Sequence, residues 1–473
     1  GENHIVLGFK HYRTMSKEND LKLAEKYLNR GKELENEAKH EETIEMYRQA
    51  SKLYEKWEEW EQWLRLNIGI GSNLHSLCKY NQGITHLKKV LEKGIAYLGE
   101  DHDYVGGCLN NLGNCYDSKG NYDLAISCHQ RGLLNSKKNW GPKHSYTAMS
   151  LNNLGICYIA KGDYNLAISY IQEALSIDKK IQGKEELPIA GTLNNLGSCY
   201  KGKEDYDLAI QYYQEALPIF KKKMGSVHPY VAGALNNLGA CYCIKGEHDL
   251  AIDYYQEAIL IYKKSFGEEN HFVAMSLNNM GHSYKAKGDY KTAINLKQKA
   301  LLIRKAFYGN EHVEVGINLN NLGECFYVQE DFKQTLYYYQ EALKVLSPGF
   351  KQENIFKNPS LTNYRNGYDL LESFEGKTKT LIKYYHKFEN TKYLQFALST
   401  IYLATDLISD IRQSYKTEGS KHTLVERAAN SYNQAIKVAL KTAKVYQNLP
   451  SIPEHPEFTN IPYTAKGCKI LAF

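Results

Sequence analysis

Six pairs of adjacent asparagines recur along this sequence at a constant interval of 42 residues. A carboxamide offers both a hydrogen-bond donor and an acceptor, so a regular row of carboxamides suits the main chain of an extended peptide. Lys201, His282 and Lys285 follow one or two helical turns later, where they would read an acidic side chain. We predict that these three residues bind a peptide together with the first asparagine of each pair: Asn110, Asn152, Asn194, Asn236, Asn278 and Asn320.

The same asparagines have a structural alternative. An asparagine that bonds to an adjacent helix and fixes the stacking of repeats would also be needed once per repeat. The second asparagine of each pair lies about 100° further round a helix, and we interpret that column as packing between repeats. Its members are Asn111, Asn153, Asn195, Asn237, Asn279 and Asn321.

Ten cysteines raise the alternatives of disulfides, a metal site or a nucleophile. Five of them occupy one repeat column: Cys115, Cys157, Cys199, Cys241 and Cys325. A small buried side chain in the core explains such a column, and equivalent positions on the order of 10 Å apart exceed the ~7 Å limit for a disulfide. Cys241 and Cys243 would point to nearly opposite helix faces, which does not suit zinc. The sequence predicts free thiols and no metal.

Four histidines also repeat, each just after a repeat glycine: His102, His144, His228 and His312. A ring that caps or fills a turn explains a column, whereas catalysis needs a single site. No pairing of a nucleophile with a base stands out, and no glycine-rich phosphate loop follows a strand. We therefore expect no catalytic site and no cofactor in this chain.

The elements that position these residues follow from the apolar spacing within one repeat. Residues 145–160 predict a first helix, which Lys161 and Gly162 end. Residues 163–181 predict a second helix capped by Asp163. Each repeat is thus a helical hairpin that must stack on its neighbours to bury its apolar faces. Small residues such as Gly155 and Ala167 would let the helices approach closely.

The pattern of Leu151, Leu154, Gly155, Tyr158, Ala167 and Ala174 resembles the tetratricopeptide consensus. The 42-residue period and the phrases LNNLG and GSVHPYVA are similar to kinesin light chain repeats and their bacterial relatives. The resemblance implies an all-α fold, a right-handed α-solenoid of helical hairpins whose first helices line a concave groove. We assign residues 1–56 to an N-terminal helical cap and residues 57–346 to about seven repeats.

The pattern breaks after Leu346, where proline and glycine mark a boundary. Leu361 and Tyr368 keep the 42-residue step, so a degenerate repeat is expected there. Long amphipathic helices are expected at about 377–415 and 421–446. We assign residues 347–448 to the degenerate repeat and a long-helix connector, and residues 449–473 to a proline-rich linker and the start of a following domain.

About seventy residues from Leu370 to Leu440 resemble the helical connector between repeats and protease in bacterial CHAT-domain proteins, which are caspase-related cysteine peptidases. The resemblance implies the regulatory arm of such a protease, with a role in bacterial defence and a CHAT domain in cis as one partner. The peptidase domain itself is not in this sequence. A free-standing kinesin-light-chain-like adaptor is the alternative, although residues 17–65 do not sustain heptads. An unrecognised enzyme would need a polar constellation that breaks the repeats.

Composition narrows the class of protein. The net charge of +6 arises from 59 basic and 53 acidic residues spread along the chain, without the basic block of a nucleic-acid binder. No apolar run approaches the ~18 residues of a membrane helix, and the N-terminus lacks the features of a signal peptide. We expect a cytoplasmic protein with a protein or peptide partner. Because the chain opens on Gly1, we expect it to be part of a longer protein.

Overall fold

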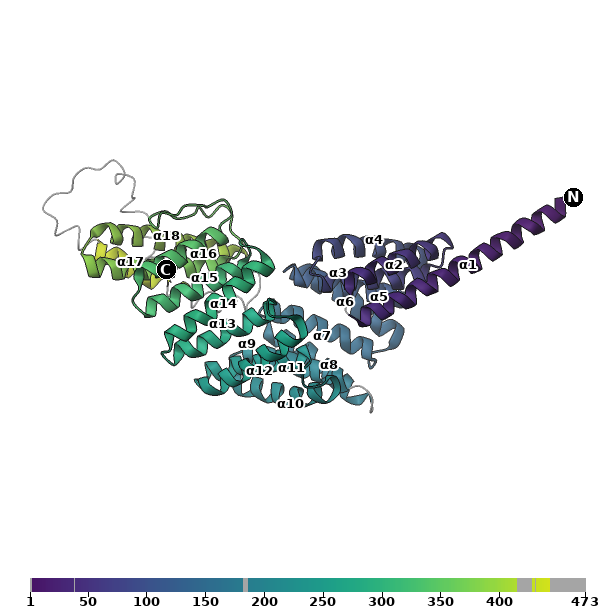
Figure 1. The fold of residues 1–473 in the computed structure, drawn as a ribbon, viewed down its shortest axis with the longest axis horizontal. Coiled ribbons are helices and arrows are strands. Elements are labelled where there is room, and N and C mark those ends of the chain that lie inside the picture. The colour runs from purple at the N-terminus through teal and green to yellow at the C-terminus, as the bar shows by residue number, and fades with distance from the viewer. Residues whose placement is uncertain (1, 38, 182–185, 415–427, 430, 443–473) are drawn as a thin grey trace. The chain divides into compact units, whose positions relative to one another are not determined.

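The computed structural model describes residues 2–37, 39–181, 186–414, 428–429 and 431–442 (Figure 1). Every regular element in this part of the chain is an α-helix, as the repeat pattern predicts. None of the described helices is long and apolar enough to cross a membrane. The chain divides between Tyr212 and Tyr213 into two compact units, and the boundary falls within one helix, α10 (Tyr206–Met224).

The described residues of the first unit form nine complete helices and the start of α10. They are α1 (Glu2–Asn36), α2 (His40–Lys56), α3 (Trp60–Ser76), α4 (Tyr80–Leu98), α5 (Asp103–Ser118), α6 (Tyr122–Trp140), α7 (Ser145–Ala160), α8 (Tyr164–Lys180) and α9 (Glu186–Gly202). Consecutive helices from α1 to α9 pack against one another. In addition, α3 packs against α5, α5 against α7 and α7 against α9. The first unit is therefore a stack of hairpins in chain order.

The second unit has the same construction. After the end of α10 come α11 (Pro229–Ile244), α12 (His248–Phe266), α13 (His271–Ala286), α14 (Tyr290–Tyr308), α15 (Val313–Val328), α16 (Phe332–Leu346), α17 (Gly367–Phe388) and α18 (Thr391–Ser414). Consecutive helices from α11 to α18 pack together, and α13 contacts α11 as α17 contacts α15. Residues 428–429 and 431–442 are helical as well.

The hairpin of α7 and α8 shows how the repeat sequence makes this fold. Its helices span residues 145–160 and 164–180, which confirms the predicted pair. Asp163 caps α8, because its Oδ1 accepts a hydrogen bond from the Leu166 N–H at 3.2 Å. A Cβ atom on Gly155 would lie 2.2 Å from the side chain of Ile171, so only glycine permits this approach of the two helices. The predicted role of Gly155 is confirmed.

The C-terminal helices differ from their sequence-based prediction in two places. Leu361 belongs to a non-helical segment, residues 347–366, so the expected repeat does not begin at the 42-residue step. The hairpin begins instead at Gly367, where the Asn366 side chain caps α17. The helix expected at 377–415 is also wrong, because α17 ends at Phe388 and Glu389 is left-handed with φ 51°.

Of the second long helix expected at 421–446, residues 428–429 and 431–442 are helical, and the remainder lies outside the described residues. Residues 449–473 lie outside them too. The predicted division at residues 56, 346 and 448 stays a prediction.

A network of hydrogen bonds ties the non-helical segment to the hairpins on either side. The Lys377 ammonium is 1% exposed and donates to Gln340 Oε1, the Lys357 carbonyl and Asn358 Oδ1 at 2.8, 2.9 and 2.8 Å. Gln340 Nε2 donates in turn to the carbonyl of Gln352 at 2.8 Å. The inserted residues are thus held by buried polar side chains of α16 and α17.

Candidate functional site

Each asparagine pair lies in the middle of the first helix of a hairpin, on α5, α7, α9, α11, α13 or α15. Four of these helices begin with a capping histidine, whose Nδ1 accepts a hydrogen bond from the N–H two residues later. The capping residues are His102, His144, His228 and His312, at distances of 3.2–3.3 Å. The predicted capping role of the histidine column is confirmed. Because the first asparagine lies eight residues after each cap, the pairs occupy equivalent positions along these four helices.

Two asparagines of the first column connect successive hairpins. Asn110 is 4% exposed, and its Nδ2 donates to Ser150 Oγ at 3.2 Å. Asn236 is 5% exposed, and its Oδ1 accepts from Ser276 Oγ at 3.0 Å. Each bond joins two first helices across 40 residues of sequence. These contacts match the packing alternative for the column.

Asn278 and Asn320 are buried as well, with internal partners. Asn320 Nδ2 donates to the Asp369 carbonyl at 2.8 Å, and its Oδ1 accepts from Ser373 Oγ at 2.7 Å. Asn278 Oδ1 accepts from Lys297 Nζ and from Asn321 Nδ2, both at 3.4 Å. The geometry therefore favours packing over peptide contact at four of the six predicted positions.

The other two members of the column are half-buried. Asn152 Oδ1 accepts from Asn195 Nδ2 at 3.0 Å, which links α7 to α9. The main-chain carbonyl of Asn194 accepts from Ser198 Oγ at 3.2 Å. The predicted peptide contact of Asn152 and Asn194 stays a prediction.

The second asparagine column is more accessible than the first. Five of its six members are half-buried, and only Asn321, at 9% exposure, is buried. Within the described residues, the side-chain amides of Asn153 and Asn279 make no hydrogen bond to another protein group, so their donors and acceptors face outward in part. The interpretation of this column as packing fits Asn195 and Asn321, whose amides bond between hairpins, and it stays a prediction for Asn153 and Asn279. The repetition alone does not reveal the difference, since both columns repeat equally well.

Of the three residues predicted to read an acidic side chain, two lie together in the second unit. The His282 ring lies 3.5 Å from the Asn278 amide, and Lys285 Nζ forms an ion pair with Glu324 at 2.6 Å. Burial, followed by the nearby cations Lys297 and Lys285, lowers the pKa of His282 to about 3, so this ring is neutral at pH 7. Lys201 is half-buried on α9, in the first unit, so its part in reading an acidic side chain stays a prediction.

Lys297, on α14, is a member of this group that sequence reasoning missed. Its side chain is 0% exposed, and burial lowers the pKa of its ammonium to about 8. The signal was present in the sequence, because Lys297 falls in a repeat column that carries tyrosine in three other hairpins: Tyr213, Tyr255 and Tyr339.

The cysteine column lies in the core, as predicted. Cys115, Cys157, Cys199, Cys241 and Cys325 are all buried. Burial raises the pKa of the Cys115 thiol to about 11, which makes it a poor nucleophile at pH 7. None of the nine described cysteines forms a disulfide. Within the same part of the chain, no group of three potential metal ligands is found.

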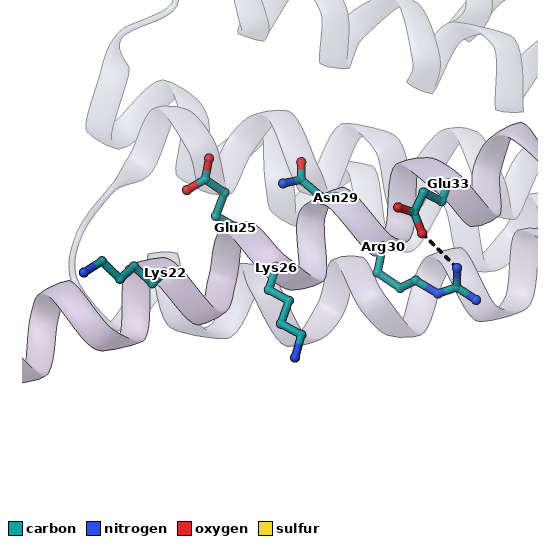
Figure 2. A pocket seen from close by; sticks show the side chains of 6 residues that line it. All are labelled: Lys22, Glu25, Lys26, Asn29, Arg30 and Glu33. Atoms are coloured by element: carbon teal, nitrogen blue, oxygen red, sulfur yellow. Dashed lines mark hydrogen bonds and ion pairs between the residues drawn. The ribbon is translucent and has the colours of Figure 1, made fainter.

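A shallow pocket on α1 is lined by side chains of alternating charge (Figure 2). Arg30 pairs with Glu33 at 2.8 Å, and Lys22 pairs with Glu18 at 2.7 Å. Figure 2 shows Glu25 on one side of the helix and Arg30 on the other, so the charged groups do not converge on one point. This surface is a solvated helix face with no assembled site.

A family model described as tetratricopeptide repeat matches six overlapping stretches of the chain. They are residues 64–138, 118–180, 146–222, 188–264, 230–301 and 272–347. Together they span residues 64–347, more than half of the sequence. No curated protein matches the chain.

Several solved structures are similar. The apo form of RapI has 15% sequence identity and a TM-score of 0.50 over 80% of this chain and 98% of that one, which supports the helical fold alone. BtubC (BKLC) from P. vanneervenii has 20% identity and a TM-score of 0.42 over 52% of this chain and 99% of that one. A putative kinesin light chain repeat protein from Podosopora anserina has 18% identity and a TM-score of 0.37, covering 44% of this chain and 98% of that one.

Proposed function

This chain belongs to the tetratricopeptide repeat family, and from that premise we propose that it binds a segment of another protein along the first helices of its hairpins. Stacked hairpins present one helix face repeatedly, so a partner in extended conformation meets the same side-chain types at regular steps. The proposal applies to each compact unit by itself.

The observation that carries this proposal is the accessibility of Asn153 and Asn279. Each is half-buried on a first helix, α7 in one unit and α13 in the other. A peptide main chain supplies one N–H and one C=O per residue, which complements a carboxamide without regard to side chains. Half-buried amides without protein partners are therefore suited to hold a main chain, whereas the buried amides of Asn110 and Asn236 are already used between hairpins.

The test compares the two asparagine columns in the full chain. Peptides of random sequence displayed on phage are selected on the wild-type protein, and the dissociation constant of each selected peptide is then measured. Asn153→Ala and Asn279→Ala are each expected to raise the dissociation constant of peptides that bind to the same unit by about tenfold, or 1.4 kcal/mol. We expect little change in melting temperature.

Asn236→Ala serves as the matched control, because it leaves the Ser276 hydroxyl without its partner inside the protein. We expect this control to lose about 1–3 kcal/mol of stability while the folded protein keeps its affinity. Equal affinity for every selected peptide in wild type, Asn153→Ala and Asn279→Ala would refute the proposed contact surface.

We further propose that the chain acts as the sensor or regulatory arm of a CHAT-type protease. Its support is the sequence resemblance of about seventy residues between Leu370 and Leu440. A kinesin-light-chain-like adaptor is the second candidate, favoured by the 42-residue period and the LNNLG phrases. The gene sequence downstream of the Phe473 codon distinguishes them, since a protease arm requires a following domain with a catalytic His and Cys.

A further inference from the structure

Lys297 interrupts a core column of the repeat. The equivalent positions hold Leu87, His129, Ile171, Tyr213, Tyr255, Lys297 and Tyr339. The large side chain at this position packs against the glycine of its partner helix, as Tyr255 does against Gly239 and Lys297 against Gly281. One hairpin thus has a charged group at a site that the other hairpins fill with an apolar, aromatic or neutral side chain. Burying an ammonium costs several kcal/mol unless acceptors surround it.

Lys297 lacks the acceptors that a buried structural lysine has. Lys377, which is also buried, donates to three oxygens at 2.8, 2.9 and 2.8 Å. Lys297 Nζ donates to one oxygen, Asn278 Oδ1, at 3.4 Å. An ammonium carries three donors. The contrast shows that Lys377 is satisfied inside the protein and that Lys297 is not.

The charges around Lys297 do not balance. Arg304 pairs with Glu314 at 3.0 Å, and Lys285 pairs with Glu324 at 2.6 Å. His282 is neutral, because burial and the surrounding cations lower its pKa to about 3. Lys285 and Arg304 therefore each have an ion-pair partner, whereas the Lys297 ammonium has none in the described part of the chain.

The same hairpin departs from the core pattern a second time. Ser283 occupies the column that holds buried cysteine in five other repeats, and it is 0% exposed. Among the described residues, its hydroxyl has no hydrogen-bond partner. Two core columns therefore become polar in one hairpin, α13 with α14, and in each case hydrogen-bonding capacity remains unused.

We propose that Lys297, with the neighbouring Lys285, forms a subsite that binds a carboxylate of an acidic residue in the partner segment. This inference rests on the proposed function of the first-helix surface. Lys285 is 19% exposed at its side chain and His282 is half-buried, so the group borders the surface. The ligand carboxylate replaces Glu324 beside Lys285 and accepts from the Lys297 ammonium, whose flexible four-carbon stem lets it turn from Asn278.

Lys297→Tyr tests this subsite, because other hairpins accommodate a tyrosine at this position, opposite the equivalent glycine of their own first helix. Peptides of twelve random residues displayed on phage are selected separately on the full wild-type chain and on the full variant. The wild type is expected to select peptides with Asp or Glu at one position. The variant is expected to lose that preference, and its affinity for the wild-type peptides is expected to fall by about tenfold or more.

Two control variants separate the subsite from general effects. Lys291→Gln removes a positive charge from an exposed position of the same helix and is expected to retain the acidic preference. Lys297→Met keeps an unbranched side chain of similar length without the charge. It is used in place of Lys297→Tyr if that variant does not fold. Circular dichroism establishes that each variant is helical.

The possible outcomes distinguish this inference from the function on which it rests. If wild type and Lys297→Tyr select the same acidic peptides with equal affinity, or if neither shows an acidic preference, the subsite is refuted while peptide binding stands. If neither protein selects any peptide, the proposed function fails, and the subsite fails with it.

Discussion

At the scale of single residues, the two buried lysines show how environment decides what a charge does. Lys377 holds the segment between α16 and α17 through three neutral oxygens, and burial lowers its pKa to about 7. Lys297 has a single weak partner and stands beside Lys285 and Glu324. The same residue type is thus structural in one hairpin and, in our proposal, a ligand-binding group in another.

The lowered pKa of Lys297 predicts a pH-dependent stability. Its folded-state pKa is about 8 and its ordinary value is 10.5, so between these values the unfolded chain binds a proton that the folded protein does not. The free energy of unfolding contributed by this group therefore rises as pH rises through that window. We expect wild type to gain on the order of 1–3 kcal/mol relative to Lys297→Met between pH 7 and pH 10.

Urea unfolding at several pH values measures this difference. Comparison with the same variant cancels the contribution of Lys377, which is present in both proteins. Lys291→Met, at an exposed position of the same helix, corrects for the loss of one positive charge. A difference between wild type and Lys297→Met that stays constant from pH 7 to pH 10 would contradict the prediction.

At the scale of secondary-structure elements, the hairpins depend on their ends. Histidine caps begin the first helices, and the turn between the two helices of a hairpin needs one residue with positive φ. Gly120, Gly162, Gly246 and Gly288 supply it in four repeats. Glu204 and Glu330 occupy the same place with φ of 63° and 60°, where a side chain is strained.

Glu204→Gly and Glu330→Gly are therefore expected to stabilise the protein. Both glutamates are exposed, so no packing is lost, and relief of the left-handed strain is worth roughly 1 kcal/mol. Chemical denaturation of each variant against wild type measures the gain. Gly162→Glu is the reciprocal control and should destabilise by a similar amount; a loss of stability in both glutamate variants would disprove the account.

At the scale of the whole molecule, the chain is two stacks of hairpins, in which consecutive helices pack together from α1 to α9 and from α11 to α18. Stability in such a protein is close to a sum of local terms, so damage is expected to remain near its origin. The same core leucine occurs in both units, as Leu154 and Leu322, and each is 0% exposed.

Leu154→Ala and Leu322→Ala should each cost about 2–5 kcal/mol of local stability. Hydrogen exchange followed by mass spectrometry is expected to show faster exchange in α7, α8 and their adjacent helices for the first variant, and in α15 and α16 for the second. Each variant is the control for the other, because the substitution and the repeat position are identical. Faster exchange spread equally over both units in either variant would mean that the chain unfolds as one cooperative body.

The sequence alone determined the hairpins, because the 42-residue period, the apolar spacing and the capping residues act locally along one helix pair. It located α7 and α8, the capping role of the histidines and the buried cysteine column. It placed the hairpin after Leu346 wrongly, because the inserted segment is held by contacts of Gln340 and Lys377 that no period encodes.

Only the tertiary structure decided which asparagine of each pair is buried. Adjacent residues differ by about 100° round a helix, and the next hairpin covers Asn236 while leaving Asn237 half-exposed. Tertiary structure also decided that the buried Lys297 ammonium has a single weak acceptor, because the residues around it come from both α13 and α15. Accessibility and charge balance depend on what packs over a side chain, and that partner lies about 20 to 40 residues away in the sequence.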